Sequence, residues 1–186
     1  MALHDRIRKL TYDDYVLIPE DGQRHEIIDG EHYVSPAPVP RHQIVGLRLK
    51  TRLFPFVQDR GLGQVLDAPT DVLFSRFDVV QPDLLYISNE RAEILTEKNV
   101  QGAPDLVVEI LSPSTRDNDE GIKLDLYERS GVLEYWIFDP VLKKAQVYRR
   151  VGDRLQIVAN LSAEGEDVLT TPLLPALELP MTEIFG

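Results

Sequence analysis

The sequence predicts an α/β (α+β) protein, and three patterns in its 186 residues carry that prediction. Residues Asp105–Leu111 form a near-continuous apolar run, which is typical of a strand covered on both faces. Residues Arg41–Gln58 repeat apolar side chains at intervals of three and four, which is typical of an amphipathic helix. Turn signals between apolar pieces, such as Asp29-Gly30, predict additional β-hairpins. The length fits one domain spanning residues 1–186.

Composition narrows the classes of function. With 43% hydrophobic and 27% charged residues, the chain has the composition of a globular protein and not of a disordered one. The absence of cysteine excludes disulfides, thiolate chemistry and cysteine-bound zinc, so any metal must be held by oxygen or imidazole. A formal charge of −11 argues against a simple nucleic-acid-binding module. It leaves room for an enzyme that uses a metal and a local basic patch.

Neither a membrane span nor a signal peptide is evident. No apolar run reaches the roughly 18 to 20 residues that a membrane-spanning helix needs. The first ten residues lack the apolar core of a signal peptide. We therefore expect a soluble, cytoplasmic protein that makes no contact with a membrane.

The first half of the chain predicts two helices and several strands. A short helix is expected over Thr11–Leu17, capped by Thr11, and a hairpin over His25–Val34. Three prolines in residues 35–40 make a stiff connector. Gly63–Phe74 is a strand or a bent pair, with Pro69 at an edge or a bulge. The long helix over Arg41–Gln58, between the connector and this strand, is expected to end before Gly61. Its apolar positions are Ile44, Val45, Leu47, Leu49, Leu53, Phe54 and Val57.

The middle of the chain predicts two strands that carry acids. In a strand over Val79–Ile87, period-two alternation places Asp83 on one face with Leu85 and Ile87, opposite Leu84 and Tyr86. A short helix or irregular segment follows over Arg91–Lys98. In the apolar run that comes next, the side chains that share one face are Asp105, Val107, Glu109 and Leu111.

The remainder predicts a helix followed by more strands. The helix covers Asp117–Ser130, with Asp117 and Glu120 as a capping box and Gly131 as its stop. Lys123 borders its apolar stripe, one turn from Asp119 and Tyr127. The segments expected after it are a strand over Leu133–Asp139, a hairpin partner over Ala145–Tyr148, a strand-rich final third, and Leu177–Phe185, which packs the end of the chain.

The two acid-bearing strands suggest a catalytic site. A carboxylate inside an apolar strand costs several kcal/mol unless it is paired, protonated or bound to metal. If the strands of Asp83 and Glu109 are neighbours, about 5 Å apart, both carboxylates can hold one Mg²⁺ or Mn²⁺, and the main-chain carbonyl of Ile110 can add a ligand. Lys123 can orient the attacking water or neutralise charge developing on phosphorus. Glu26 is a candidate third acid.

Each candidate also has a simpler explanation. Asp83 can accept a hydrogen bond from a backbone amide at the start of a strand. Asp105 is the alternative to Asp83 as the first acid of the site, although its place at a strand entrance is also explained by turn chemistry. Lys123 can pair with Asp119 at i, i+4 spacing. Glu26 can pair with Arg24 or His42, His42 can make a simple polar contact, and Trp136 can lie in the core.

Four cations of the long helix can form a solvated face, and they are also the best candidate for a patch that contacts a nucleic-acid backbone. They are Arg41, Arg48, Lys50 and Arg52.

Several segments together resemble the Uma2 (DUF820) family of restriction-endonuclease-like proteins, over essentially the whole chain. The segments that carry the resemblance are Glu26-Ile-Ile-Asp-Gly-Glu31, Ser35-Pro36 through Arg41-His42-Gln43, Gln81-Pro82-Asp83-Leu84, Gly102 through Thr115, Gly131-Val-Leu-Glu-Tyr-Trp136 and Pro172-Leu-Leu-Pro175. The resemblance implies the PD-(D/E)XK nuclease fold, a restriction-endonuclease-like core with a mixed central β-sheet flanked by helices.

The resemblance also implies roles for particular residues. Asp83 matches the acid of the family's Pro-Asp element, and Glu109 matches the acid of its (D/E)-X-K element. This chain has Leu111 where the motif has lysine. In several branches of the superfamily the lysine has moved to the adjacent helix, which makes Lys123 the candidate here.

Our leading hypothesis is a metal-dependent endonuclease that hydrolyses DNA phosphodiester bonds. Asp83, Glu109 and Glu26 would hold Mg²⁺ or Mn²⁺, Lys123 would assist attack, and a homodimer would suit cleavage of both strands. The alternative is a non-catalytic binding or assembly protein that retains a nuclease-like fold, which Leu111 and the negative charge favour. A third hypothesis, an enzyme that processes sugars or small acids with paired carboxylates, is weaker because a lysine accompanies the acids.

Overall fold

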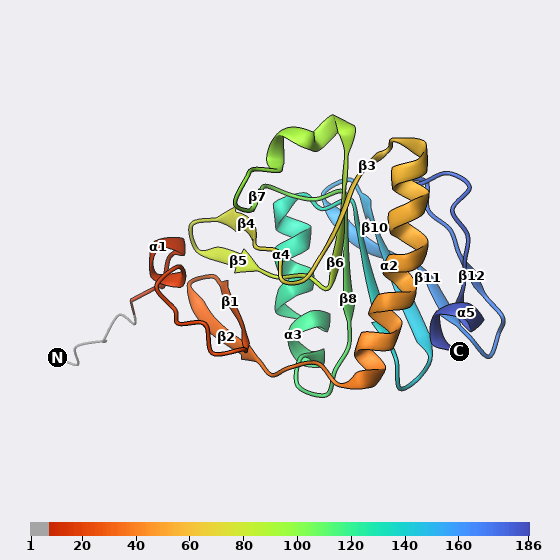
Figure 1. Cartoon of the computed structure of the whole chain (residues 1–186), viewed down its shortest axis with the longest axis horizontal. Helices are drawn as coiled ribbons and strands as arrows, with labels where there is room; N and C mark the ends of the chain where they lie inside the picture. The colour runs from red at the N-terminus through yellow and green to blue at the C-terminus, as the bar shows by residue number, and fades with distance from the viewer. Residues whose placement is uncertain (1–7) are drawn as a thin grey trace.

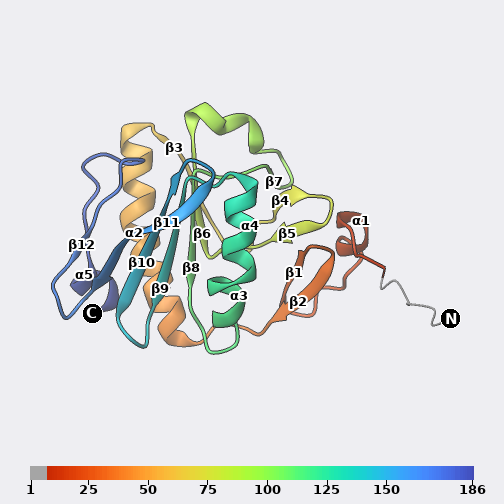
Figure 2. The ribbon, with the colours of Figure 1, turned by 180° about the vertical axis from the view of Figure 1, so that it is seen from behind.

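The computed structural model describes residues 8–186 (Figures 1 and 2). Its helices are α1 (Tyr12–Tyr15), α2 (Pro40–Arg60), the 3₁₀ helix η1 (Asn89–Ile94), α3 (Arg116–Glu120), α4 (Ile122–Ser130) and α5 (Met181–Phe185). Its strands are β1 (Arg24–Ile28), β2 (Glu31–Ser35), β3 (Gly63–Asp67), β4 (Val72–Ser75), β5 (Asp78–Val80), β6 (Leu84–Ser88), β7 (Val100–Gln101), β8 (Leu106–Ile110), β9 (Glu134–Asp139), β10 (Lys144–Val151), β11 (Arg154–Ser162), β12 (Val168–Leu169) and β13 (Leu179–Pro180).

A six-stranded sheet in the order β11-β10-β9-β8-β6-β3 forms the centre of the fold. Only β8 and β9 run parallel in this sheet, so the sheet is mixed. Helices α2 and α5 cover one face, and α3 and α4 cover the other (Figures 1 and 2). This arrangement confirms the predicted mixed central sheet between helices. Among residues 8–186, no helix is both long and apolar enough to cross a membrane.

A second sheet, in the order β2-β1-β5-β4-β7, lies beside the first, on the side of the N-terminus (Figure 1). The predicted hairpin is confirmed as β1 and β2, joined by Asp29 and Gly30 with positive φ values of 53° and 78°. These angles at both central positions are those of a type I′ turn, which matches the twist of the strands. Gly63–Phe74, predicted as a strand or a bent pair, contains two strands, β3 and the start of β4, which belong to different sheets and do not pair with each other.

The prediction of one continuous strand over Val79–Ile87 is wrong, because this segment contains parts of two strands, β5 and β6. The chain leaves the second sheet at the end of β5 and enters the first at β6, with Gln81-Pro82-Asp83 between them. Pro82 has no N–H to donate to a ladder, and the Gln81 N–H donates instead to Glu26 Oε1 at 2.9 Å. Asp83 therefore stands in the crossing between two sheets, one residue before β6, and not within a strand.

The strands of the central sheet alternate between two apolar layers. Leu84 and Tyr86 of β6 face the layer formed with α2 and α5, and Leu85 and Ile87 face the layer under α4. All five residues of β8 are buried, which confirms the prediction of a strand covered on both faces. A charged side chain in β8 therefore has no route to bulk water along the strand, and its charge needs a local partner.

Helix α2 confirms the predicted long helix but has a narrower apolar stripe. Its buried residues are spaced four apart, at Val45, Leu49, Leu53 and Val57. The prediction was wrong for three positions, because Ile44, Leu47 and Phe54 are 50%, 61% and 46% exposed. A helix that packs on a sheet through one ridge buries only the side chains of that ridge.

The predicted helix over Asp117–Ser130 is two helices. Gly121 breaks it with φ −117° and ψ −98°, and a Cβ there would lie 2.8 Å from the Asp117 carbonyl oxygen. The predicted capping box between Asp117 and Glu120 is also wrong, since Thr115 is the N-cap and Glu120 pairs with Arg116 at 3.2 Å. Gly131 ends α4 in the left-handed region, as predicted.

Candidate active site

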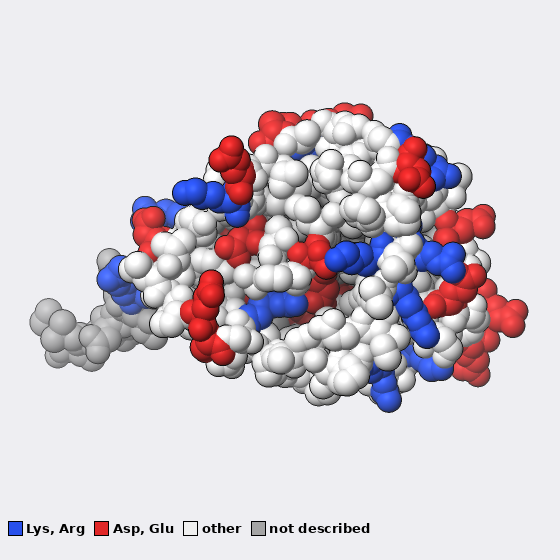
Figure 3. Space-filling model, viewed as in Figure 1, with Lys and Arg blue, Asp and Glu red and all other residues white. Residues whose placement is uncertain are grey.

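A cavity of about 240 Å³ lies where the two sheets, the start of α2 and the helix α3 meet. The connector before α2 and the loop of residues 112–115 form its rim. The acidic residues that line it are Asp83, Glu109 and Asp119, and the basic ones are Arg24, His42 and Lys123. In the space-filling view, acidic side chains are visible within a hollow to the left of α2 (Figure 3).

Glu109 is the last residue but one of β8 and is 1% exposed. Its Oε1 accepts hydrogen bonds from Lys123 Nζ at 3.1 Å and from the Tyr127 hydroxyl at 2.7 Å. Both donors come from α4, which covers this face of the sheet. The packing of α4 on β8 therefore fixes the orientation of this carboxylate.

Lys123 lies at the centre of three carboxylates and is 2% exposed. Its Nζ lies 3.0 Å from Glu26, 3.1 Å from Glu109 and 3.3 Å from Asp119. The structure thus brings together the predicted residues Glu26, Glu109 and Lys123. Three carboxylates hold the pKa of Lys123 well above its usual value against the opposing effect of burial, so the ammonium stays charged.

Asp83 occupies the neighbouring wall of the cavity and has partners of its own. Arg24 Nη1 and His42 Nε2 lie 2.9 Å and 3.0 Å from its two carboxylate oxygens. The backbone N–H of Ile110 donates to Asp83 at 2.7 Å, so Ile110 meets the site through its N–H, whereas we predicted a role for its carbonyl. Burial alone would raise the pKa of Asp83, but His42 and Arg24 outweigh it and hold the pKa below its ordinary value.

The buried cluster contains more negative than positive charge. Four carboxylates, including Glu26 and Asp119, face two permanent cations, Lys123 and Arg24. Burial raises the pKa of Glu109 to about 8, Lys123 opposes this effect, and the neighbouring carboxylates add to it. At neutral pH the cluster therefore holds a proton in place of a missing positive charge.

This charge imbalance predicts a pH dependence of stability. Because the folded protein binds a proton on Glu109 more tightly than the unfolded chain, the resulting stabilisation is complete below about pH 4.5 and is lost as the pH rises to about 8. In Glu109→Gln we expect this fall in the free energy of unfolding to disappear. Urea unfolding at several pH values measures it. The two proteins should differ least near pH 5, and parallel curves up to pH 8 would contradict the assignment.

Sequence reasoning missed Asp119 as a site residue and gave it only as a partner of Lys123. Asp119 is 1% exposed and lines the cavity, and its Oδ1 has no hydrogen-bond partner within residues 8–186, because the contact with Lys123 lacks hydrogen-bond geometry. Arg24 was considered as a partner for Glu26, yet it pairs with Asp83. The i, i+4 spacing from Asp119 to Lys123 was the available signal, but only the packing of α3 shows that the pair is buried.

The donor set suits a hard divalent cation, although no ready-made metal site is present. Within residues 8–186, no group of three or more carboxylate, imidazole or thiolate side chains is arranged to hold an ion. The Lys123 ammonium takes the space between the carboxylates. The carboxylate oxygens, among them Asp119 Oδ1, which accepts no hydrogen bond within residues 8–186, and the excess negative charge nevertheless fit Mg²⁺ or Mn²⁺.

The competing candidates lie elsewhere. Asp105 accepts a hydrogen bond from the Ser88 N–H at 2.7 Å and lies 3.4 Å from Arg91, at the opposite end of β8 from Glu109's cavity. Trp136 is fully buried, as predicted for a core residue. Arg91 and the Ser88 N–H therefore neutralise and bind the Asp105 carboxylate, which does not line the cavity.

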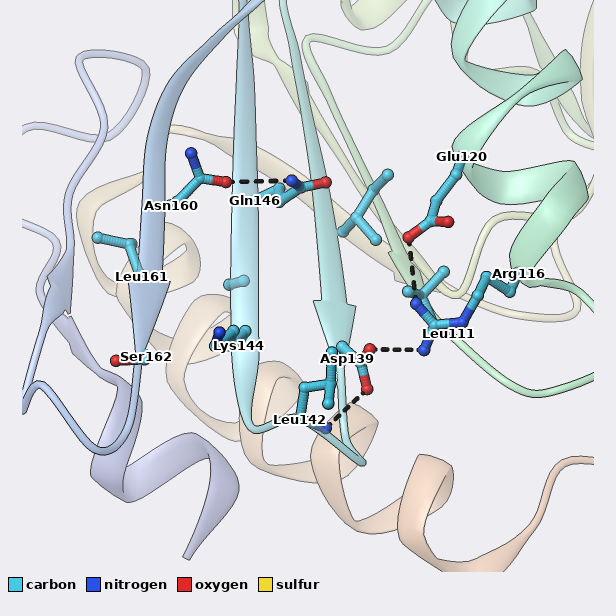
Figure 4. Close-up of a pocket in the computed structure, with 12 residues that line it drawn as sticks. Leu111, Arg116, Glu120, Asp139, Leu142, Lys144, Gln146, Asn160, Leu161 and Ser162 are labelled. Atoms are coloured by element: carbon cyan, nitrogen blue, oxygen red, sulfur yellow. Dashed lines mark hydrogen bonds and ion pairs between the residues drawn. The ribbon is translucent and has the colours of Figure 1, made fainter.

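A larger cavity of about 450 Å³ lies beyond α3, over β9, β10 and β11 (Figure 4). Arg116 in this cavity is already bound by Asp139 at 2.5 Å and by Glu120 at 3.2 Å. Gln146 and Asn160 bond each other at 3.1 Å. Its polar side chains largely satisfy one another, so the smaller, charge-imbalanced cavity is the better candidate for chemistry.

Comparisons with known proteins show the family and the fold of the chain. The chain is 27% identical over 158 residues to "Uncharacterized protein slr1290" of Synechocystis sp., covering 83% of this chain and 82% of that protein. Its fold matches a crystal structure described as "a putative nuclease belonging to DUF820" from Anabaena variabilis, with a TM-score of 0.78, 19% identity, and coverage of 95% and 97% of the two chains. The Uma2 family model, described as "Putative restriction endonuclease", matches residues 12–182, and the chain belongs to that family.

Proposed function

We propose that this protein is a metal-dependent endonuclease that hydrolyses DNA phosphodiester bonds. The observation that carries the proposal is the cavity that Asp83, Glu109 and Asp119 line beside Lys123, with an excess of negative charge. The Uma2 description and the fold shared with a DUF820 protein point to the same class of reaction.

Mg²⁺ or Mn²⁺ would be held by Asp83, Glu109 and Asp119, and when bound it would supply Lewis-acid charge and activated water. Glu26 does not line the cavity, and it pairs with the Lys123 ammonium at 3.0 Å. Lys123 carries the positive charge that the reacting phosphate needs, and Tyr127 fixes the carboxylate of Glu109. Arg24 and His42 hold Asp83 ionised and correctly oriented.

Binding of Mn²⁺ tests the metal site independently of activity. In isothermal titration calorimetry we expect heat of binding with the wild type and a loss of about 10-fold or more in affinity with Asp119→Asn, because Oδ1 of Asp119 is a buried oxygen that accepts no hydrogen bond from residues 8–186. The matched control is Asp105→Asn, which alters a buried acid at the other end of β8 and should bind Mn²⁺ as the wild type does.

Equal Mn²⁺ affinity in the wild type and in Asp119→Asn would remove Asp119 from the metal site. Absence of any Mn²⁺ heat would favour the alternative function, a non-catalytic binding or assembly protein. The observation that favours this alternative is the ion pairing of Lys123 with three carboxylates at 3.0 to 3.3 Å, which already neutralises the charge of the ammonium. The homodimer stays a prediction.

A further inference from the structure

The four cations that the sequence places on α2 differ in their surroundings. Lys50 pairs with Asp67 at 2.5 Å, and Arg52 pairs with Glu183. Arg48 donates to the Ile184 carbonyl at 3.2 Å, and the exposed Arg41 makes no ion pair within residues 8–186. Two of the four charges are therefore neutralised by carboxylates, and two are not.

Arg41 and Arg48 share a groove of about 360 Å³ with Lys143, which comes from the turn between β9 and β10. Lys143 donates to the Gly186 carbonyl at 3.0 Å. The other lining residues are apolar, and no Asp or Glu of the described part of the chain lines the groove. A backbone carbonyl, which carries no net charge, orients Arg48, and Arg41 makes no ion pair within residues 8–186, so these two positive charges remain available to an anion, with Lys143 beside them.

This concentration of charge is notable in a chain of formal charge −11. In the space-filling view, Lys and Arg side chains gather over α2, beside the hollow in which acidic side chains are visible (Figure 3). Local clustering of one sign, more than total charge, governs the attraction of a charged partner. The three cations of the groove would draw a polyanion to this side of the molecule.

We propose that the groove of Arg41, Arg48 and Lys143 binds the phosphate backbone of the DNA whose scissile bond enters the candidate active site, an inference that rests on the proposed function. The start of α2 links the two places, because Arg41 lines the groove and the next residue, His42, contacts Asp83. Arg41 and Arg48 are seven residues apart, about 10 Å along the helix axis. That span exceeds the separation of successive phosphates along one strand, so the groove can engage more than one phosphate.

The test measures binding without cleavage. A short fluorescein-labelled DNA duplex is titrated in EDTA, by fluorescence anisotropy, at about 50 and 200 mM salt. If three phosphates are neutralised in the groove, Arg41→Ala/Arg48→Ala/Lys143→Ala should reduce the salt slope of log K by about 2.7, so the wild type should lose about 40-fold more affinity than the variant over this range. Arg41→Ala alone, which breaks no internal bond, should reduce the slope by about 0.9.

Two controls separate the outcomes. Arg52→Ala removes a positive charge from the same helix but from a neutralised pair, and it should leave the salt slope unchanged. Cleavage of plasmid DNA by the wild type with Mn²⁺ tests the proposed nuclease separately. Absence of that cleavage, with the salt slopes as expected, would refute the proposed nuclease and leave the binding result valid.

Three results would overturn the groove assignment. One is an unchanged DNA salt slope in both Arg41→Ala and the triple variant. Another is an equal loss in Arg52→Ala, which would indicate a general effect of net charge. The third is a variant Arg41→Ala that binds a labelled poly-glutamate peptide more weakly than the wild type but binds DNA equally well. That result would identify an acidic polypeptide as the occupant of the groove.

Discussion

DNA cleavage in the presence of Mn²⁺ is expected to fall by about 10³-fold or more when Glu109 is replaced by glutamine. Glutamine keeps the side-chain volume and an oxygen that can accept the Tyr127 hydrogen bond, which is 2.7 Å long in the wild type. It removes the negative charge that a divalent cation requires, and a metal's Lewis-acid contribution amounts to several kcal/mol of barrier. A gel assay of plasmid nicking, followed over time at saturating Mn²⁺, measures the rates.

The control for this experiment is Asp105→Asn, because Asp105 also lies at a buried end of β8 but is held by the Ser88 N–H and Arg91. It should cleave at a rate close to that of the wild type. Equal cleavage by Glu109→Gln and the wild type, with both proteins folded, would end the assignment of Glu109. Loss of cleavage in both variants would instead indicate a general defect of β8.

The sequence predicted the parts of the site that depend on a local pattern. Glu109 stood out because an ionisable side chain lay within a continuous apolar run, and that run is the buried strand β8. Lys123 stood out because it bordered an apolar helical stripe, and it is buried. The Asp29-Gly30 turn followed from the backbone angles that its two residues tolerate. In each case the residues that decide the structure are close together in the chain.

The sequence failed where the structure depends on distant segments. Nothing within Val79–Ile87 shows that its two halves join different sheets, because that outcome depends on pairing of β5 with β1 and of β6 with β8. The pairing of Arg24 with Asp83 joins residues 59 positions apart. The exposure of Leu47 and Ile44 depends on which ridge of α2 meets the sheet. Local periodicity cannot supply any of these contacts.

Lys123→Met is expected to destabilise the protein by about 3 to 5 kcal/mol, the usual cost of removing one partner from a buried ion pair. Methionine replaces the aliphatic part of the lysine side chain but leaves the carboxylates of Glu26, Glu109 and Asp119 facing one another without a cation. Urea unfolding near pH 8 measures the loss. The double variant with Glu109→Gln should lose less than the sum of the two single effects, because it also removes one of the repelling charges.

Mn²⁺ distinguishes the structural role of this lysine from a role in catalysis. Without the ammonium, the three carboxylates form an oxygen cage open to a divalent cation, so Mn²⁺ should raise the free energy of unfolding of Lys123→Met more than that of the wild type. The control is Lys50→Met, which removes a cation from a half-exposed pair with Asp67 and should lose about 1 kcal/mol or less. A loss below about 1 kcal/mol for Lys123→Met would mean that the carboxylates are mostly protonated and that the lysine does not hold the cluster together.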